Sequence, residues 1–313
     1  MAGIEELKKK GLLRAGSDER FRIKRIPFGL ADLDKITNGG VPRGRITILT
    51  GNYSCGKTFL TQLLVKHAIG LGCTTALVDA ERSFDPNWWE QVGIDIGQMM
   101  VHQPNDGEQA VDMMADLIRE GVDVVVLDSL AGLVPMELLK EAKHKSVAPQ
   151  ARLINRLMQI VLTIGSPSAV VCTNQLRSGL GGNFPTDTMP GGKGQEFFAS
   201  LIVRVHREGW IEEQGRRVGF NMRVVVRKSK VGTPFQECIL PFLFRGEIDE
   251  LSLLVERSLE ADLITQSGPW YSILGGDNMM GRNTVIEKIA TDSELRRRLE
   301  ESLEGRASDD PSL

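Results

Sequence analysis

Apolar residues occur along the first two thirds of the chain in two alternating patterns. Short continuous apolar runs predict buried strands, and apolar positions three and four residues apart predict helices between them. The predicted strands cover residues 46–50, 76–78, 122–127 and 169–173, and the predicted helices cover residues 58–69, 108–118 and 153–164. Strands and helices that alternate in this way predict an α/β fold with a mostly parallel central sheet flanked by helices.

The pattern changes after residue 200. Three further strands, predicted over residues 201–205, 222–226 and 236–240, follow one another without helices, so we expect the sheet to end in antiparallel strands. From residue 247 the sequence becomes acidic and mainly helical in pattern. We therefore predict a short polar N-terminal segment, a core, a small C-terminal α/β domain and a flexible tail, which cover residues 1–25, 26–246, 247–306 and 307–313.

The composition is that of a globular protein. Of the 313 residues, 41% are hydrophobic and 25% are charged, values close to globular averages. No apolar run approaches the length of about 20 residues that crosses a bilayer, and Glu5 and Glu6 argue against a signal peptide. Four widely spaced cysteines without a CxxC pair predict a reduced, cytoplasmic protein with no structural metal and no membrane partner.

The net charge of −3 conceals an uneven distribution. Residues 140–230 carry 15 Lys and Arg against 6 Asp and Glu, whereas residues 247–313 carry 7 against 15. A basic middle next to an acidic end is typical of a protein with a polyanion-binding face. Solvated surfaces of mixed charge would give the same counts, so charge alone leaves both interpretations open.

The most specific local motif is GxxxxGK[ST], which lies between a predicted strand and a predicted helix. This context is typical of a P-loop, in which backbone N–H groups and the helix N-terminus face phosphate oxygens. Lys57 would neutralise the β- and γ-phosphates, and the Thr58 hydroxyl would complete the shell of a Mg²⁺ ion. Cys55 fits the loop as a small side chain, not as a nucleophile. The motif consists of Gly51, Asn52, Tyr53, Ser54, Cys55, Gly56, Lys57 and Thr58.

Two carboxylates complete the predicted nucleotide site. Asp128 ends an apolar strand, where it would hold Mg²⁺ through water, and Glu81 follows the strand over residues 76–78. Glu81 is well placed to activate the attacking water, although a solvated surface glutamate would have the same local sequence. The sequence lacks the guanine-reading NKxD motif, which favours ATP. Asp85 and Trp88 are further candidates for ATP binding, Trp88 by stacking on adenine unless it belongs to the core.

An ordered series of motifs extends well beyond the P-loop. After it come Asp79-Ala80-Glu81, Asp85-Pro86, Gln103-Pro104, Gly107-Glu108-Gln109-Ala110, Leu127-Asp128-Ser129-Leu130-Ala131, Asn174-Gln175-Leu176-Arg177, Gly191-Gly192, Phe197-Phe198-Ala199-Ser200, Lys228-Ser229-Lys230, Pro234-Phe235 and Trp270-Tyr271-Ser272. A P-loop alone defines only a superfamily, but this series resembles the bacterial RecA recombinase family over roughly residues 10–300. The resemblance implies a RecA-like P-loop ATPase core.

The resemblance also implies a function. A homo-oligomeric helical filament would bind ATP and Mg²⁺, assemble on single-stranded DNA and exchange strands with homologous double-stranded DNA. Glu81 matches the residue that activates water, and Gln175 matches one that senses the γ-phosphate and reports it to a following loop. Lys228 and Lys230 match lysines that reach the ATP of the neighbouring subunit, and Phe197 matches a residue of the subunit interface.

Two loops would hold DNA near the filament axis, the first over about residues 136–150 and the second over about residues 177–192. The second is glycine-rich, and its Leu180 and Phe184 could insert between bases without reading them, although a surface loop of no function would also be polar and glycine-rich. Arg207 and Arg223 match a second site for the incoming duplex. The full set of predicted DNA-binding residues is Arg152, Asn155, Arg156, Arg177, Leu180, Phe184, Gly191, Gly192, Arg207 and Arg223.

The chain departs from the family pattern at several positions. Gln159 replaces an arginine, Lys193 replaces an asparagine, and Val225 replaces a lysine of the second DNA site, with Arg227 nearby. The segment over residues 1–25, which in the family packs on the next subunit, is short. These departures are typical of a compact or divergent member, such as one encoded by a phage.

Two other classes of protein have such a core. A regulator or mediator of the same fold would bind ATP and DNA without strand exchange, but we expect such a relative to lose Glu81, Gln175 or the lysine pair. A hexameric helicase motor would carry a large N-terminal domain and an arginine where this chain has Lys228 and Lys230. The residues therefore favour the recombinase.

Overall fold

The computed structural model describes residues 3–140, 148–178, 187–192 and 194–309. Its central sheet consists of β3 (Ile46–Gly51), β4 (Thr75–Asp79), β5 (Met99–His102), β6 (Val124–Asp128), β7 (Ala169–Gln175), β10 (Leu201–Glu213), β11 (Arg216–Ser229), β12 (Glu237–Leu243) and β13 (Glu247–Ile248). The order across the sheet is β13-β12-β11-β10-β3-β7-β6-β4-β5. Strands β10 to β5 run parallel and the pairs from β10 to β13 are antiparallel, which confirms the predicted sheet.

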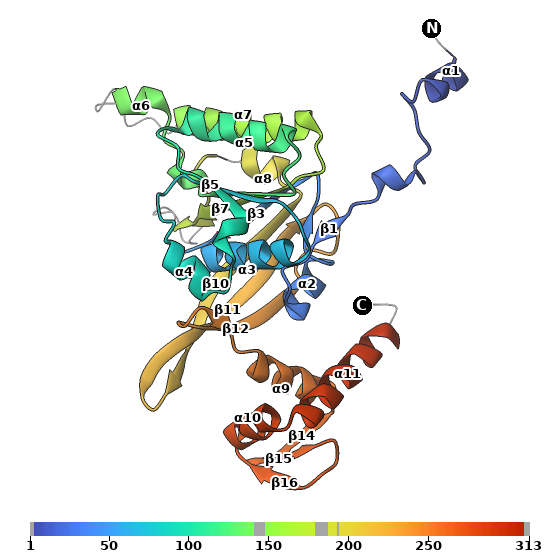
Figure 1. The fold of residues 1–313 in the computed structure, drawn as a ribbon, viewed down its shortest axis with the longest axis vertical. Helices are drawn as coiled ribbons and strands as arrows, with labels where there is room; N and C mark the ends of the chain where they lie inside the picture. Colours follow the sequence, from blue (N-terminus) through green and yellow to red (C-terminus); the bar gives the residue numbers. More distant parts are fainter. Residues whose placement is uncertain (1–2, 141–147, 179–186, 193, 310–313) are drawn as a thin grey trace, which may run out of the picture.

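Helices cover both faces of this sheet (Figure 1). One face carries α2 (Ala31–Ile36), α3 (Lys57–Gly70) and α4 (Pro86–Gln91), and the other carries α5 (Gly107–Arg119) and α7 (Ala148–Ile164). Successive strand residues point to opposite faces, so Val124 and Val126 of β6 join the core beneath α3, whereas Val125 and Leu127 join the core beneath α5 and α7. Strands β3, β4, β6 and β7 are therefore buried on both faces, as the strands of parallel sheets generally are.

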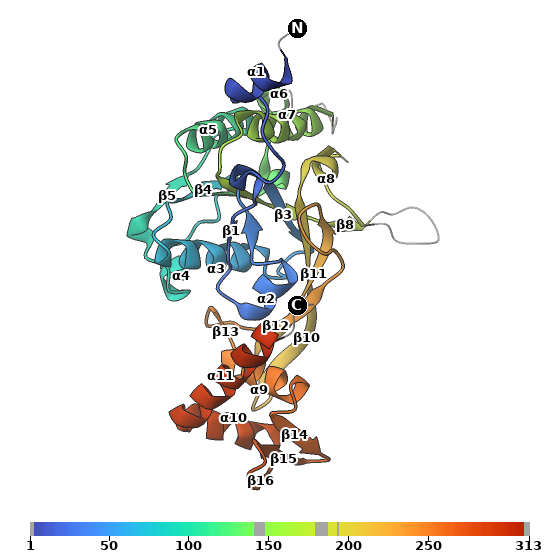
Figure 2. The same ribbon diagram turned by 90° about the vertical axis from the view of Figure 1, so that its right-hand side faces the viewer.

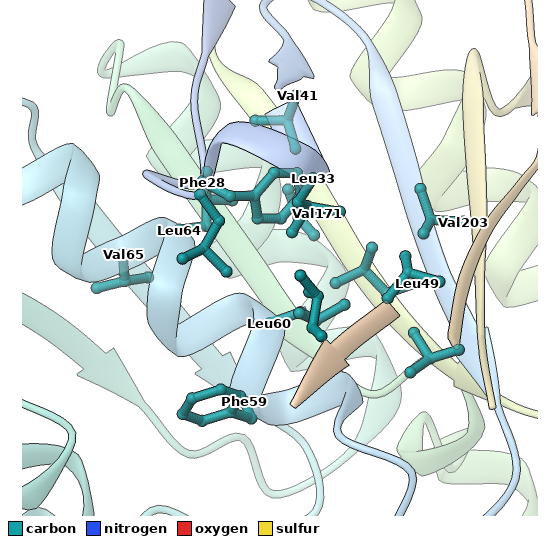
Figure 3. Packing of buried hydrophobic residues seen from close by; sticks show 14 of the residues in the cluster. Phe28, Leu33, Val41, Leu49, Phe59, Leu60, Leu64, Val65, Val171 and Val203 are labelled. Atoms are coloured by element: carbon teal, nitrogen blue, oxygen red, sulfur yellow. The ribbon is translucent and has the colours of Figure 1, made fainter. Parts of the chain in front are cut away.

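The packing of α3 fixes the start of this helix relative to β3. Leu60 and Leu64 are fully buried and belong to one cluster with Leu49 of β3, Val171 of β7 and Val203 of β10 (Figure 3). Fully burying one such aliphatic side chain contributes about 1.5 to 3 kcal/mol. Because both ends of the intervening loop are held in the core, the loop between β3 and α3 has little freedom.

The β10–β11 hairpin is much longer than the sequence predicts, with strands of 13 and 14 residues. Its outer half interrupts the apolar residues with charged ones and is largely exposed near the turn, so it lacks the apolar run that reveals the inner half. Gln214 and Gly215 form the turn with φ values of 49° and 75°, which suit a tight hairpin. Oppositely charged residues face each other next to the turn, Glu212 opposite Arg217 and Glu213 opposite Arg216.

Shorter elements connect or flank the central sheet. They are α1 (Ile4–Lys9), β1 (Arg25–Ile26), β2 (Val41–Pro42), α6 (Met136–Lys140), β8 (Arg177–Ser178), β9 (Asp187–Thr188), α8 (Gly194–Phe198) and three 3₁₀ helices, Glu19–Phe21, Ile96–Gln98 and Leu130–Gly132.

The predicted boundaries of the first loop, at about residues 136 and 150, are wrong. Helix α6 begins at Met136, and α7 already begins at Ala148. Residues 141–147 lie outside the described part of the chain.

The C-terminal region has a core of its own, built around Val255, Ile264, Tyr271 and Val285. Its elements are α9 (Glu250–Glu260), β14 (Ile264–Ser267), β15 (Trp270–Ile273), β16 (Asn278–Met280), α10 (Arg282–Thr291) and α11 (Ser293–Asp309). Helix α11 continues through residues 307–309, which the sequence assigns to a flexible tail, so that boundary is wrong. The division of the chain into domains otherwise stays a prediction.

The N-terminal segment lies at the opposite end of the molecule from the C-terminal region (Figure 2). Its apolar side chains are exposed, among them Ile4, Leu12 and Phe21. Of the helices in the described ranges, none is long and apolar enough to cross a membrane.

Candidate functional site

The P-loop joins β3 to α3 with the geometry expected of its glycines. Gly56 has a φ of 100°, in the left-handed region, and a Cβ atom there would lie 2.2 Å from Met222 Sδ of β11. A Cβ atom on Gly51 would lie 2.3 Å from the carbonyl oxygen of Val205 on β10. Gly51 is therefore required by the close approach of the β10 backbone, and Gly56 by its left-handed conformation, in addition to any contact with phosphate.

Lys57 and Cys55 point back into the loop. Lys57 Nζ donates hydrogen bonds to the carbonyl oxygens of Gly51 at 3.2 Å and Asn52 at 2.7 Å. Cys55 Sγ donates to the Asn52 carbonyl oxygen at 3.0 Å, and burial raises the pKa of its thiol. A buried thiol with a raised pKa is a poor nucleophile, which fits the packing role expected of Cys55. The ammonium of Lys57 lies within the loop, at the centre of the candidate phosphate site.

Asp128 and Thr58 meet as the sequence predicts. Thr58 Oγ1 donates to Asp128 Oδ2 at 2.8 Å, and Thr173 Oγ1 donates to Asp128 Oδ1. Burial raises the pKa of Asp128; the hydrogen bonds from Thr173 and Thr58 act in the opposite direction, and the carboxylates of Glu81 and Asp79 raise the pKa further. A hydroxyl next to a buried carboxylate is an oxygen donor set that suits Mg²⁺.

Glu81 lies at the same edge of the sheet. Ser129 Oγ donates a hydrogen bond to Glu81 Oε1, and Gln175 Nε2 donates to the same oxygen at 3.4 Å. In the sheet, Gln175 is paired with Gly51 and Asp128 with Asp79, so these side chains follow the carboxyl ends of adjacent parallel strands. Ligand sites of open α/β sheets lie at this edge. The surroundings of Glu81 are those of a site residue, not of an isolated surface glutamate.

Asp79 is a residue of the site to which the sequence assigns no role. Its buried carboxylate accepts hydrogen bonds from the backbone N–H groups of Ser83 at 3.1 Å and Phe84 at 2.9 Å, and from Gln103 Nε2 at 2.9 Å. These bonds hold the turn that carries Glu81. The signal in the sequence is an acidic residue at the very end of an apolar strand, the same signal that identifies Asp128.

Asp85 and Trp88 have structural contacts of their own. Asp85 caps α4 by accepting a hydrogen bond from the backbone N–H of Asn87 at 3.0 Å. Trp89 is buried in the core, and Trp88 is half-buried against it. With the Gln62 amide oriented to accept, its oxygen lies 3.1 Å from Trp89 Nε1 and 3.3 Å from Trp88 Nε1. Binding of ATP by Asp85 and Trp88 stays a prediction.

The end of the second predicted loop packs against α7. Gly191 has a φ of 91°, and a Cβ atom there would lie 2.3 Å from Ile154 Cδ1; Gly192 has a φ of 80°. Gln195, which the sequence does not single out as a site residue, donates from Nε2 to the carbonyl oxygens of Pro190 at 2.6 Å and Gly192 at 3.0 Å. Its Oε1 accepts from Asn174 Nδ2 at 2.7 Å. This buried network ties the loop end to β7.

Four of the remaining residues predicted at the two loops lie in the described part of the chain, and the others lie outside it. Arg152 and Arg156 are exposed on successive turns of α7, with carboxylates of Glu137 and Asp112 at 3.5 and 3.8 Å. Asn155 lies between them against Gly194, where a Cβ atom would lie 2.0 Å from Asn155 Oδ1. The backbone of Arg177 is paired with Thr188. The positions outside the described residues are Leu180, Phe184 and Lys193.

Lys228, Lys230 and Phe197 form one group away from the P-loop. Lys228 Nζ donates to the carbonyl oxygens of Glu196, Phe197 and Ala199, the last at 2.9 Å. Lys230 Nζ donates to the carbonyl oxygen of Phe197 at 2.7 Å and lies 5.3 Å from the centroid of its ring, which is part of a side chain that is 73% exposed. Burial lowers the pKa of Lys228, and the nearby Lys230 lowers it further.

The lysine group and the P-loop lie at different levels of the sheet. Lys228 is paired with Ile202 of β10, whereas Gly51 at the end of β3 is paired with Val205. Each residue of a strand advances by about 3.3 Å, so Lys228 lies about 10 Å from the level of Gly51 along the strands. The ammonium of Lys228 is hydrogen-bonded to the backbone of residues 196–199.

Arg207 and Arg223 line one groove of about 350 Å³ on β10 and β11. The groove brings in further side chains that the sequence does not assign to DNA, the cationic Arg204 and Arg227 and the imidazole of His206. Two carboxylates, Glu208 and Glu237, also line it. We return to this groove below.

Comparison with known proteins identifies similar chains. The family model described as RecA N-terminal domain matches residues 2–249. The chain is 35% identical to Protein RecA of Aquifex aeolicus over 289 residues, which cover 90% of this chain and 83% of the relative. It is 35% identical to Protein RecA of Acidothermus cellulolyticus over 314 residues, with coverages of 97% and 91%. Identity to Protein RecA of Caldanaerobacter subterraneus subsp. tengcongensis is 33% over 301 residues, with coverages of 94% and 88%.

Proposed function

The chain belongs to the RecA family, and from this premise we propose that it is an ATP-dependent recombinase that assembles as a helical filament on single-stranded DNA. The chain is a DNA recombination and repair protein of that family. In the proposed reaction, the filament pairs its single strand with homologous double-stranded DNA and exchanges the strands. The observation that carries this proposal is the meeting of the P-loop, Asp128, Glu81 and Gln175 at one edge of the sheet.

The P-loop supports ATP binding. Lys57 Nζ would leave the carbonyl oxygens of Gly51 and Asn52 and donate to phosphate oxygens, while the N-terminus of α3 faces the same charge. Thr58 and Asp128 would hold Mg²⁺, which when bound supplies positive charge to the phosphates. A cation there would also favour the ionised form of Asp128 against the effect of burial.

Glu81 supports hydrolysis. It would accept a proton from the attacking water as general base, and the hydrogen bonds from Ser129 and Gln175 hold its carboxylate in place. Gln175 ends β7 just before the second loop, so an exchange of its bond to Glu81 for one to the γ-phosphate would move the start of that loop. This is how nucleotide state would be coupled to DNA binding.

The lysine group supports a site shared between subunits. Lys228 and Lys230 are hydrogen-bonded to the backbone around Phe197, at another level of the sheet from the P-loop, and Phe197 is exposed as a residue of a contact surface would be. In a filament these lysines would approach the ATP of the neighbour and stabilise charge there, as an arginine finger does. A regulator or mediator that does not hydrolyse ATP needs neither Glu81 nor this group, so that alternative is not favoured.

The proposal is tested by measuring ATP hydrolysis with and without single-stranded DNA, with duplex DNA as a control, followed by strand exchange with homologous and unrelated duplexes. We expect strong stimulation by the single strand and exchange with the homologous duplex alone. Stimulation without exchange would indicate the regulator or mediator. Hydrolysis that is indifferent to DNA would contradict the proposal.

A further inference from the structure

The groove on β10, β11 and β12 contains a cation that is already bound by carboxylates. We propose that Glu237, assisted by Glu208, is a positioning residue that holds Arg223 in an ion pair and so withdraws it from DNA phosphates. The cationic groove would then take up duplex DNA with one arginine masked. This inference rests on the proposed function, in which the groove receives the incoming duplex.

The register of the strands brings these side chains to one face. His206 is paired with Arg223 across β10 and β11, and Glu208 is paired with Asn221, two residues from Arg223. On the other side, Glu237 of β12 is paired with Val225, again two residues from Arg223. Residues two apart on a strand share a face, so Arg223 lies between two diagonal carboxylates.

The contacts of Arg223 are those of a bidentate ion pair. Its Nη2 donates to Glu237 Oε1 and Oε2, both at 2.9 Å, and its Nε donates to Oε2 at 3.2 Å. Its Nη1 lies 3.6 Å from Glu208 Oε1. A guanidinium uses the same fork of N–H groups for a carboxylate and for a phosphate. Arg223 therefore has to leave Glu237 before it can bind a phosphate in that way.

The rest of the groove remains cationic. Burial lowers the pKa of His206, and the positive charges of Arg204, Arg223 and Arg227 lower it further, which shows that these cations act on one small space. Arg204 and Arg227 also line the groove. Burial lowers the pKa of Arg204, and the positive charge of Arg227 lowers it further, as expected of two cations in the same space. The groove can thus attract a polyanion while Arg223 is paired.

The pair is accessible to a competing ligand. The Arg223 side chain is 43% exposed and that of Glu237 is 49% exposed, so the solvent screens their attraction. An exposed pair of this kind exchanges partners at little cost. We infer that Glu237 sets how readily the groove takes up the duplex, because every phosphate contact of Arg223 competes with this carboxylate.

The test compares Glu237→Gln with Glu212→Gln, which removes the same charge from the adjacent β10–β11 hairpin, where Glu212 is the partner of Arg217 at 3.6 Å. Filaments preassembled on single-stranded DNA with a non-hydrolysable ATP analogue are titrated with a labelled short duplex at several salt concentrations. We expect E237Q to bind the duplex severalfold more tightly. Its slope of log affinity against log salt should be steeper by about 0.9, the value for one more phosphate contact.

A third variant tests whether the effect of Glu237→Gln on duplex binding depends on Arg223. In the Arg223→Gln background, E237Q should no longer steepen the salt slope, because no guanidinium is released. Equal affinities and slopes for E237Q and E212Q would overturn the masking of Arg223 and leave only an effect of net charge. A wild-type filament that assembles but binds no duplex would instead contradict the proposed function, so the two failures are distinguishable.

Discussion

The contacts of single residues explain why Glu81 can act on a water molecule. Its carboxylate accepts hydrogen bonds from Ser129 and Gln175, while the turn beneath it is held by the buried carboxylate of Asp79. A general base must be held within hydrogen-bonding distance of the proton that it removes. Removing the charge of Glu81 should therefore affect the chemical step without disturbing the P-loop.

We expect Glu81→Gln to bind ATP and single-stranded DNA with nearly normal affinity but to hydrolyse ATP about 10² to 10⁴ times more slowly, because an amide cannot accept the proton. Steady-state hydrolysis and fluorescent-nucleotide binding provide the measurements. Glu90→Gln, on the exposed surface of α4, is the matched control and should behave as wild type. Unimpaired turnover of the Glu81 variant would exclude Glu81 as the base.

The residues of the nucleotide site could be predicted from sequence because each belongs to a local motif at the end of an apolar strand. The pairing of Arg223 with Glu237 could not be predicted in the same way. It depends on the register between β11 and β12, and the two residues are 14 positions apart with no motif that joins them. The hydrogen bonds of Gln195 to Asn174 and Pro190 could not be predicted from the sequence either, because no motif joins these residues.

At the scale of elements, the contact between α7 and the second loop determines where this loop ends. Gly191 is closely packed against Ile154, a fully buried residue of α7 that cannot move aside. Gly165, between α7 and β7, also has a positive φ, of 65°, but a Cβ atom there would lie no closer than 4.0 Å to Thr163 O. Substitution strains the backbone at both glycines, but only Gly191 has a close contact with a core side chain.

We expect Gly191→Ala to lower the free energy of unfolding by about 1 to 3 kcal/mol more than Gly165→Ala, since only the first overpacks the core. Affinity for single-stranded DNA should fall in Gly191→Ala alone, because the loop end is displaced from α7. Urea denaturation and fluorescence anisotropy measure the two effects. Equal behaviour of the two variants would mean that the contact with Ile154 has no influence on the loop.

Asp123 joins elements at the edge of the sheet opposite to the nucleotide site. It accepts hydrogen bonds from Arg43 at 2.7 Å and from the backbone N–H and hydroxyl of Thr74, both at 2.9 Å. Burial raises the pKa of Asp123, but the hydrogen bonds from Arg43 and Thr74 outweigh it, so the pKa lies below its ordinary value. A lowered pKa stabilises the fold above the unfolded-state pKa, and this contribution is lost as the pH falls through the folded-state pKa.

We expect Asp123→Asn to cost about 1 to 3 kcal/mol of unfolding free energy at neutral pH, because the new amide group faces donors. The difference from wild type should shrink below about pH 4, where wild-type Asp123 also becomes protonated. Urea denaturation across this range measures it, with Asp116→Asn on the surface of α5 as control. A difference that is independent of pH would refute the electrostatic explanation.

The elements themselves were predictable where apolar periodicity is strong. Strands β3, β4, β6 and β7 are buried on both faces, and their continuous apolar runs reveal them. The edge strand β5 has only four residues, and the outer part of the β10–β11 hairpin mixes apolar with charged residues, so neither shows a long apolar run. The small C-terminal sheet of β14, β15 and β16 has strands too short to establish a pattern.

At the scale of the whole molecule, the two halves of the proposed catalytic site lie at different levels of the sheet. The P-loop lies at the carboxyl end of β3, and Lys228 with Lys230 lies near the start of β10. A head-to-tail contact between copies would bring the lysines of one subunit to the P-loop of the next. Such a heterologous contact generates a helical filament when its rotation does not close into a ring.

This arrangement predicts that two inactive variants complement each other. Lys57→Ala lacks the phosphate-binding lysine but keeps the lysine group, and Lys228→Ala keeps the P-loop but lacks one lysine that a neighbour would need. Each alone should hydrolyse ATP poorly on single-stranded DNA, with losses of about 10³-fold or more for the finger lysine by analogy with arginine fingers.

The decisive measurement mixes the two variants on the same DNA. Interfaces that combine the intact P-loop of one variant with the intact lysines of the other should recover activity. If Lys228 instead acted on the P-loop of its own chain, no mixture of the two variants would contain a complete site, and activity would stay at the sum of the separate proteins. Anisotropy of labelled DNA, measured in parallel, verifies that both variants are bound.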